Sequence, residues 1–483
     1  MISVRSFIRI ALRSAGLCGV RGLSIVAAAA LVVTLGPARA GADVSLALDS
    51  SKGEPPSLFS DGMVLQRDAV VPVFGKADPG EAVEVTIASQ TKSTVAAANG
   101  TWRVELDPVA AGGPYELVVH GNNTITIGNV LAGDVWVCAG QSNLVIRRPR
   151  QSELDLYPTI RTMGRGGQWD ERPSAMAFAF ARELNAELGV PIGLINRAAG
   201  GTSMRNWLSP SAASDPDPDV QAIVSTWDSW GDEYERQVQP FAGYAIRGVL
   251  YWQGEQDLKL ARQHPGNIDI FYHLLPALIR SWRADWQSGN IPFVLVQLPT
   301  GGGLQLEQTV APLPLAPPAE GIAVRMRQAT FNGLSEPATT LMVSVDVEGA
   351  VHPKDRELYG YRLANAALGG SAYGESFAYS GPIYASMTLE AAGRVRLRFK
   401  PNTAEGLVAE GGPLQGFSIS EDGENFVWAE AEIQGNEVVV WNDAIAAPTV
   451  VHYAWDHFPT WANLFNGTGL GTAPFSTTET PAP

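Results

Sequence analysis

The sequence has few of the residues that build disulfide frameworks and metal sites. It contains two cysteines and six histidines among 483 residues, and no cluster of these types has the spacing of metal ligands. Cys18 lies in the amino-terminal segment, which leaves Cys138 as the only cysteine beyond it. A single cysteine excludes an intramolecular disulfide, and an apolar neighbourhood predicts a buried, unreactive thiol. We expect neither a metal nor another cofactor.

Positive charge is also scarce. Lysine and arginine number 34 against 49 aspartates and glutamates, which gives a net charge of −15. The first forty residues hold five arginines and no acid, so their removal takes the net charge to −20. Such an acidic protein is not expected to bind nucleic acid or an anionic membrane surface. Its substrate is expected to be neutral, or to be held locally by a few arginines.

The chain lacks an apolar run long enough to cross a membrane. The run Leu23–Leu35 falls well short of the roughly 20 residues that a spanning helix needs. It follows a basic lead of four arginines and precedes Ala38-Arg39-Ala40, a small-x-small cleavage pattern. Residues 1–40 are therefore predicted to be a signal peptide of the general secretory route, and the mature protein to be periplasmic or secreted. A retained membrane anchor is the alternative, which the short run disfavours.

The remaining chain divides into regions of different periodicity. Residues 41–129 carry short alternating apolar runs separated by turn sequences, which is typical of a β-sandwich. Residues 130–370 alternate strands with helices, which predicts a parallel sheet with crossover helices. Residues 371–476 return to alternating runs and predict a second β-sandwich, and residues 477–483 a disordered tail. The predicted fold class is α/β, with a parallel-sheet domain flanked by two β-sandwich domains.

The elements of the middle region follow from their apolar patterns and turn residues. The predicted strands are Val135–Cys138, Val190–Asn196, Tyr244–Trp252, Pro292–Leu298 and Leu341–Asp346, and the predicted helices are Ser174–Leu188, Ile270–Trp286, Val324–Leu334 and Glu357–Leu368. A loop rich in glycine and proline separates the last two strands.

Polar or small residues follow four of these strands: Ser142, the pair Gly200-Gly201, Gln253 and His352. Loops at the carboxyl ends of parallel strands converge on one crevice. A serine hydroxyl, a histidine base and amide donors for an oxyanion are what acyl transfer needs. The alternative for each residue is structural: a helix cap for Ser142 and Gln253, a tight turn for the glycines, and a loop role for His352.

Four stretches resemble the ordered sequence blocks of the SGNH-hydrolase superfamily and, more narrowly, of the sialate O-acetylesterase family. They are GDVWVCAGQSN, GLINRAAGGTSMRNW, YAIRGVLYWQGEQD and VHPKDRELYGYRLA. Flanking stretches such as PSLFSDGMVLQR and NLFNGTGLGTAPF are similar to that family as well. The resemblance covers nearly all of the chain beyond the predicted signal peptide.

The resemblance implies a serine esterase that removes O-acetyl groups from sugars, notably sialic acids, without a cofactor. Ser142 would be the nucleophile and His352 the base, with Gly200 or Gly201 and Gln253 as oxyanion donors. The alternatives are a deacetylase of xylan or another glycan with the same chemistry, or a carbohydrate-binding protein with a degenerate site. The expected partner is an O-acetylated sugar or glycan; the oligomeric state is not specified.

The sequence departs from the family before the histidine. The family usually carries an aspartate two or three residues earlier, where this chain has Gly349 and Ala350. Asp346 or Glu348 could orient the ring of His352 instead, as could a backbone carbonyl. This departure is the reason for the binding-protein alternative.

A second departure is the basic stretch after the predicted nucleophile. Arg147 or Arg148 could pair with a substrate carboxylate, such as that of a sialic acid. The alternative is a solvated basic loop.

Overall fold

The computed structural model describes residues 44–46, 58–146, 148–164, 167–299, 309–319, 321–347 and 351–478. The predicted signal peptide, residues 301–308 and 320 of the loop rich in glycine and proline, Arg147 and Glu348 lie outside these residues. From Ala42 onward the chain forms one compact unit.

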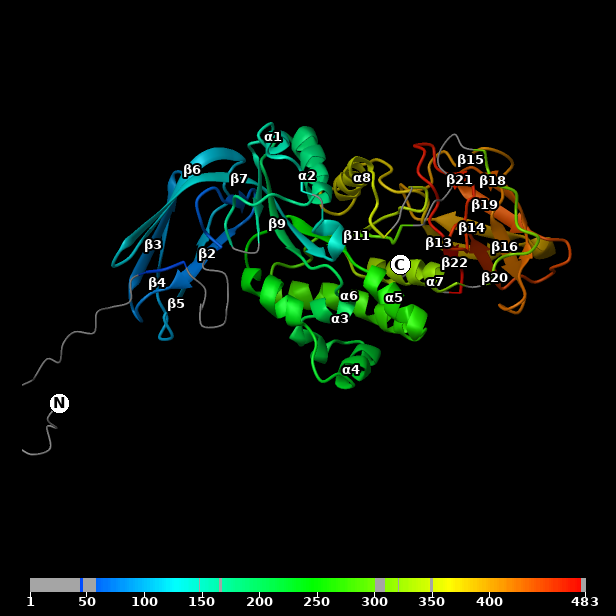
Figure 1. The fold of residues 1–483 in the computed structure, drawn as a ribbon, viewed down its shortest axis with the longest axis horizontal. Coiled ribbons are helices and arrows are strands. Elements are labelled where there is room, and N and C mark those ends of the chain that lie inside the picture. Colours follow the sequence, from blue (N-terminus) through cyan, green and yellow to red (C-terminus); the bar gives the residue numbers. More distant parts are fainter. Residues whose placement is uncertain are drawn as a thin grey trace, which may run out of the picture. The chain divides into compact units, whose positions relative to one another are not determined.

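A parallel sheet in the order β8-β9-β7-β10-β11-β12 forms the centre of the fold (Figure 1). Its strands are β7 (Thr124–Gly140), β8 (Ile160–Met163), β9 (Ile192–Ala198), β10 (Gly248–Trp252), β11 (Phe293–Val296) and β12 (Thr339–Met342). Of the strands of this sheet, β7 comes first in the chain. It lies inside the sheet, with strands that come later in the chain on both sides. The α/β fold class with a parallel sheet is therefore confirmed, and five of these strands overlap the predicted ones.

Both faces of this sheet are buried under helices. Along β7, Val135 and Val137 belong to one hydrophobic cluster, and Trp136 and Cys138 belong to another. The first cluster includes residues of α6 (Asn267–Trp286) and α7 (Ile322–Thr330), and the second includes residues of α2 (Ala175–Leu188) and α8 (Arg356–Gly369). A strand covered on both faces explains the nearly continuous apolar run in the sequence.

Helix α2 shows how local sequence sets an element. Ser174 is its amino-terminal cap, and its hydroxyl accepts a hydrogen bond from the Ala177 amide at 3.1 Å. Gly189 ends the helix in the left-handed conformation with a φ of 65°, where glycine is favoured. These two residues bracket the predicted range Ser174–Leu188.

The amino-terminal β region is continuous with the parallel sheet. The first part of β7 pairs with β6, and its last part pairs with β9 and β10. The predicted boundary between residues 129 and 130 therefore falls inside one strand. The other strands of this region are β1 (Val64–Gln66), β2 (Val71–Lys76), β3 (Ala82–Ile87), β4 (Gln90–Val95), β5 (Thr101–Leu106) and β6 (Gly112–His120). Their buried residues share one cluster with those of α6.

Asp134, on β7, joins several parts of the chain. Its fully buried carboxylate accepts hydrogen bonds from Gln66 at 3.0 Å, Arg67 at 3.1 Å, Arg247 at 3.1 Å and the Tyr373 hydroxyl at 2.9 Å. Burial alone would raise the pKa of this carboxyl, but the two arginines and the neutral donors hold it below its usual value. Losing one partner of such a buried pair typically costs about 3–5 kcal/mol.

The carboxy-terminal β region contains two four-stranded sheets, β13-β14-β19-β18 and β17-β16-β20-β22. Their strands are β13 (Tyr384–Leu389), β14 (Val395–Phe399), β16 (Phe417–Ser420), β17 (Val427–Trp428), β18 (Glu430–Gln434), β19 (Glu437–Trp441), β20 (Val450–Tyr453) and β22 (Phe475–Ser476), and the shorter β15 (Val408–Ala409) pairs with β21 (Leu464–Phe465). One cluster of buried side chains contains residues of both sheets. The Thr477 amide still donates to Val451 at 3.0 Å, so regular bonding continues past the predicted start of the tail.

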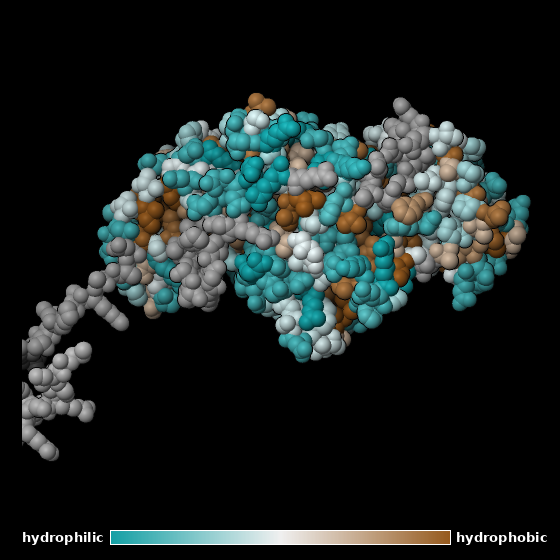
Figure 2. Space-filling model, viewed as in Figure 1, coloured by the Kyte–Doolittle hydropathy of each residue, from teal (hydrophilic) through white to brown (hydrophobic). Residues whose placement is uncertain are grey.

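The visible face of the molecule is largely hydrophilic. Figure 2 shows hydrophobic residues on it as separate patches among polar ones. No helix within the described residues has the length and apolar character that a bilayer crossing requires.

Candidate active site

A tight turn after β7 presents Ser142. Gly140, the last residue of β7, has a φ of 118°, and a side chain there would place Cβ 2.0 Å from the Trp252 carbonyl oxygen. Only glycine fits this approach of two strands. The chain is then held by the Gln141 amide, which donates to Trp252 at 3.0 Å. Ser142 begins the short helix η3 (Ser142–Leu144) at the carboxyl edge of the sheet, between β9 and β10.

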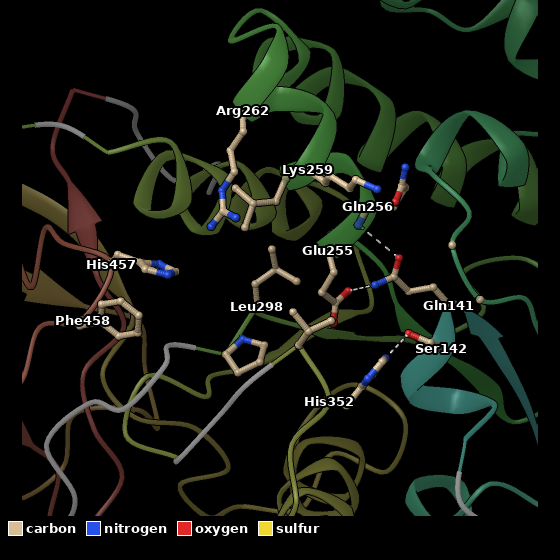
Figure 3. Close-up of a pocket in the computed structure, with 15 residues that line it drawn as sticks. Gln141, Ser142, Glu255, Gln256, Lys259, Arg262, Leu298, His352, His457 and Phe458 are labelled. Atoms are coloured by element: carbon tan, nitrogen blue, oxygen red, sulfur yellow. Dashed lines mark hydrogen bonds between the residues drawn. The ribbon is translucent and has the colours of Figure 1, made fainter.

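The structure brings Ser142 and His352 together. His352 Nε2 lies 2.8 Å from Ser142 Oγ (Figure 3). Ser142 is half-buried and His352 is exposed. The two residues are 210 positions apart in the chain, and their separation in space suits direct proton transfer. The roles of nucleophile and base remain predictions.

The glycine pair lies beside this serine. A Cβ on Gly200 would be 3.6 Å from the Cβ of Ser142, and Gly201 has a φ of 80°. Among the residues that the structure describes, none accepts a hydrogen bond from the amides of Ser142, Gly200 or Gly201. Unpaired N–H groups next to a serine hydroxyl are suited to hold an oxyanion.

Gln253 is placed differently from the expectation. Its side chain is buried and does not line the cavity. The side-chain amide donates to the Thr202 carbonyl at 2.6 Å and to Asp257 at 2.7 Å, which occupies both of its hydrogens. Asp257 also accepts from the Met204 amide at 2.9 Å. In this structure Gln253 fixes the turn that follows the glycines instead of offering a donor to the site.

Glu255 connects both halves of the site. Its carboxylate accepts hydrogen bonds from Asn143 at 2.7 Å, from the Trp252 indole at 2.8 Å and from the Gln141 side chain. Asn143 also donates to the carbonyl of Val351 at 3.0 Å. The residues on both sides of Ser142, and the residue before His352, are thereby linked to the carboxylate of Glu255.

The environment of Glu255 favours its neutral form. Burial raises the pKa of this carboxyl to about 7, although hydrogen bonds from its own backbone amide, Trp252 and Asn143 act in the opposite direction. Asp257, nearby on the same helix α5 (Glu255–Gln263), raises it further. Burial also raises the pKa of Asp257 to about 6.

Neither acid proposed to orient the histidine is shown to do so. Asp346 forms a two-pronged ion pair with Arg362, with both contacts at 2.7 Å. Its carboxylate is therefore engaged away from His352, which corrects that part of the prediction. Glu348 lies outside the described residues. Within the described ranges, no carboxylate or carbonyl accepts a hydrogen bond from His352 Nδ1.

Of the two arginines predicted to bind a carboxylate, the structure describes only Arg148, and it does not line the cavity. Arg148 is exposed and lines a different depression, together with Glu153 and Arg182. Arg147 lies outside the described residues.

The cavity above Ser142 and His352 has a volume of about 880 Å³. Its other walls come from α5, from the segment after β11 and from the carboxy-terminal β region (Figure 3). They include Leu258, Lys259 and Arg262, then Leu298 and Pro299, and finally His457 and Phe458. A cavity of this size accepts far more than an acetyl group. No pattern in the sequence indicated that His457 and Phe458 would line the cavity.

Arg327, on α7, fixes two of these walls to each other. Its buried guanidinium donates to the carbonyls of Leu298 at 3.1 Å, Pro299 at 3.4 Å, Asp456 at 3.1 Å and His457 at 3.2 Å. Burial lowers the pKa of Arg327 to about 10. Arg327 thus joins the carboxy-terminal β region to the segment after β11, with two carbonyl contacts on each side.

Two further expectations concern groups away from the cavity. Cys138 is fully buried, as predicted, and burial raises the pKa of its thiol to about 12. Asp217, Asp219 and His273 have ligand atoms within 4.8 Å of one another, a grouping that sequence spacing did not reveal. The His273 ring already pairs with Asp217 at 3.0 Å.

Comparisons with known proteins find similarity to carbohydrate acetylesterases. The model of the family described as carbohydrate esterase, sialic acid-specific acetylesterase, matches residues 132–313. The sialate O-acetylesterases of Homo sapiens and Pongo abelii are each 27% identical over 402 residues, covering 68% of this chain and 72% of theirs. The crystal structure of a carbohydrate acetylesterase from Xanthomonas citri is similar with a TM-score of 0.71 and 29% identity, covering 87% of this chain and 98% of that one.

Glu255→Gln should change how stability depends on pH. The raised pKa of Glu255 means that the folded state binds a proton between the ordinary value near 4.5 and about 7. The free energy that protonated Glu255 contributes to folding is fully present below this pH range and is lost as the pH rises through it. Between pH 5 and pH 8, the free energy of unfolding in urea should fall by about 2 kcal/mol more for the wild type than for the variant.

The matched control is Glu235→Gln, which removes an exposed carboxylate. Its unfolding free energy should run parallel to that of the wild type over the same pH range. Parallel curves for Glu255→Gln as well would contradict the assignment of a buried, proton-binding carboxyl at this position.

Proposed function

We propose that this chain, a carboxylic ester hydrolase similar to the sialate O-acetylesterases, is a serine esterase that removes O-acetyl groups from sugars, with acetylated sialic acids as its substrates. The observation that carries this proposal is the 2.8 Å contact between Ser142 Oγ and His352 Nε2 at the floor of the cavity.

The first half-reaction transfers the acetyl group to the protein. Ser142 Oγ attacks the acetyl carbonyl carbon while His352 Nε2 takes the hydroxyl proton. The carbonyl oxygen becomes an oxyanion, which the amides of Ser142, Gly200 and Gly201 are positioned to receive. The bond to the sugar oxygen then breaks, and His352 gives its proton to that oxygen.

The second half-reaction restores the enzyme. Water attacks the acetyl-serine carbonyl, and His352 accepts a proton from the water. Collapse of the second tetrahedral intermediate releases acetate, and the proton returns to Ser142 Oγ. The donors that hold the first oxyanion also serve the second, because the same carbonyl oxygen is involved.

The hydrogen bonds around Glu255 support this mechanism by limiting movement at the site. The serine turn and the histidine loop are held through Asn143, which contacts both Glu255 and the Val351 carbonyl. Preorganisation of this kind reduces the cost of reaching the reactive geometry.

Ser142→Ala and His352→Ala should each lower kcat for acetate release from a chromogenic acetyl ester by about 10⁴-fold or more, because each removes a group that acts in both half-reactions. Matched controls are Ser288→Ala and His120→Ala, exposed residues outside the cavity. These should keep kcat within about twofold of the wild type, since surface changes rarely alter a distant site. Turnover that survives Ser142→Ala would contradict the mechanism.

We also propose that residues 1–40 direct export and are removed. The basic lead, the short apolar run and Ala38-Arg39-Ala40 support this, and an exported esterase would meet acetylated glycans outside the cytoplasm. Amino-terminal sequencing of the protein recovered from the periplasm or medium should give a first residue at or near Gly41. A protein that retains its first forty residues would contradict cleavage.

A further inference from the structure

The cavity next to Ser142 carries two positive side chains without a counter-charge. Lys259 and Arg262 line it, and neither forms a hydrogen bond or ion pair with any residue in the described part of the chain. Other arginines near the sheet are neutralised, as Arg362 is by Asp346 and Arg280 is by Asp215. Both residues are exposed, so an anion that enters the cavity can reach them.

Helix geometry explains why these cations face the cavity. Glu255, Leu258, Lys259 and Arg262 occupy positions i, i+3, i+4 and i+7 of α5, which lie on one face of a helix. All four line the cavity. The Glu255 carboxylate is turned toward Gln141 and the neighbours of the serine, so it does not neutralise Lys259.

The two cations have different strengths as anion ligands. Arginine offers a planar fork of donors that matches a carboxylate, and lysine offers a mobile point charge. In Figure 3 both side chains lie on the α5 side of the cavity, with Arg262 extending toward His457 and Lys259 lying closer to Gln141. A carboxylate bound to either of them would lie in the same cavity as the reactive hydroxyl.

The remaining walls fit the body of a sugar acid. Leu298 and Phe458 supply apolar surface on the side away from Ser142. The volume of about 880 Å³ lies in the range of roughly 300–1,000 Å³ that is usual for small-molecule sites. One acetylated monosaccharide with its carboxylate could therefore occupy the cavity as a whole.

We propose that Lys259 and Arg262 bind the carboxylate of an O-acetylated sugar acid while Ser142 attacks its acetyl group. This assignment rests on the proposed esterase function and gives α5 the role expected from the sequence for Arg147 and Arg148. It distinguishes acidic sugars of the sialic acid type from neutral acetylated glycans, which have no group to pair with these cations.

The test compares two substrates that differ only in the carboxylate: O-acetylated N-acetylneuraminic acid and its methyl ester. Acetate release gives kcat/KM for each. The wild type should favour the free acid by about 10-fold or more, because a charge-assisted pair is lost in the ester. In the double variant Lys259→Gln with Arg262→Gln, this ratio should fall to about one, mainly through a higher KM for the acid.

The matched control is Arg148→Gln, which removes an exposed arginine outside the cavity and should keep the wild-type ratio. A wild-type ratio near one, or a double variant that keeps the wild-type ratio, would overturn the proposal. Hydrolysis of a neutral chromogenic acetyl ester distinguishes a failure of the carboxylate subsite from a failure of the proposed esterase function. If the wild type cleaves that ester and the ratio is one, only the carboxylate subsite is wrong; if it cleaves no acetyl ester, the esterase function fails and the subsite with it.

Discussion

The geometry of the site depends on one half-buried carboxylate, that of Glu255, which accepts hydrogen bonds from three side chains. Glu255 accepts hydrogen bonds from residues on both sides of Ser142 and from the end of β10, and through Asn143 it reaches the loop of His352. The serine and the histidine come from distant parts of the chain, so their 2.8 Å contact needs such a link. Burial raises the pKa of this carboxyl to about 7, because the unfavourable burial of its charge outweighs the hydrogen bonds that the carboxylate accepts.

Strand β7 gives this arrangement its rigidity. It pairs with the amino-terminal β region at one end and with β9 and β10 at the other, and Asp134 binds partners from three further parts of the chain. The carboxy-terminal β region is joined to the cavity by Arg327 in a similar way. The β regions are therefore part of the structure that positions the site, since His457 and Phe458 line the cavity itself.

The sequence predicted the parts of this structure that depend on local pattern. Apolar periodicity was sufficient for α2, and the strands of the parallel sheet followed from short apolar runs. Ser142 and His352 could be paired because loops after parallel strands converge, and the family resemblance supplied the roles.

Contacts between distant segments could not be predicted in the same way. Both hydrogens of the Gln253 amide are taken by Thr202 and Asp257, and nothing in the local sequence distinguishes such a group from a free donor. Asp346 stands near the histidine in sequence, yet its charge is neutralised by Arg362. Lys259 and Arg262 line the cavity because their spacing places them on one face of α5. The sequence shows that spacing, but it does not show which face of the helix lines the cavity.

The most direct test of the central claim is covalent labelling with a fluorophosphonate, which reacts with a serine hydroxyl that a neighbouring base has activated. The account predicts one phosphonyl group per chain, mapped by peptide mass spectrometry to Ser142, and much slower labelling when His352 is replaced by alanine. Labelling at another residue, or an absence of labelling in a protein that hydrolyses acetyl esters, would contradict it.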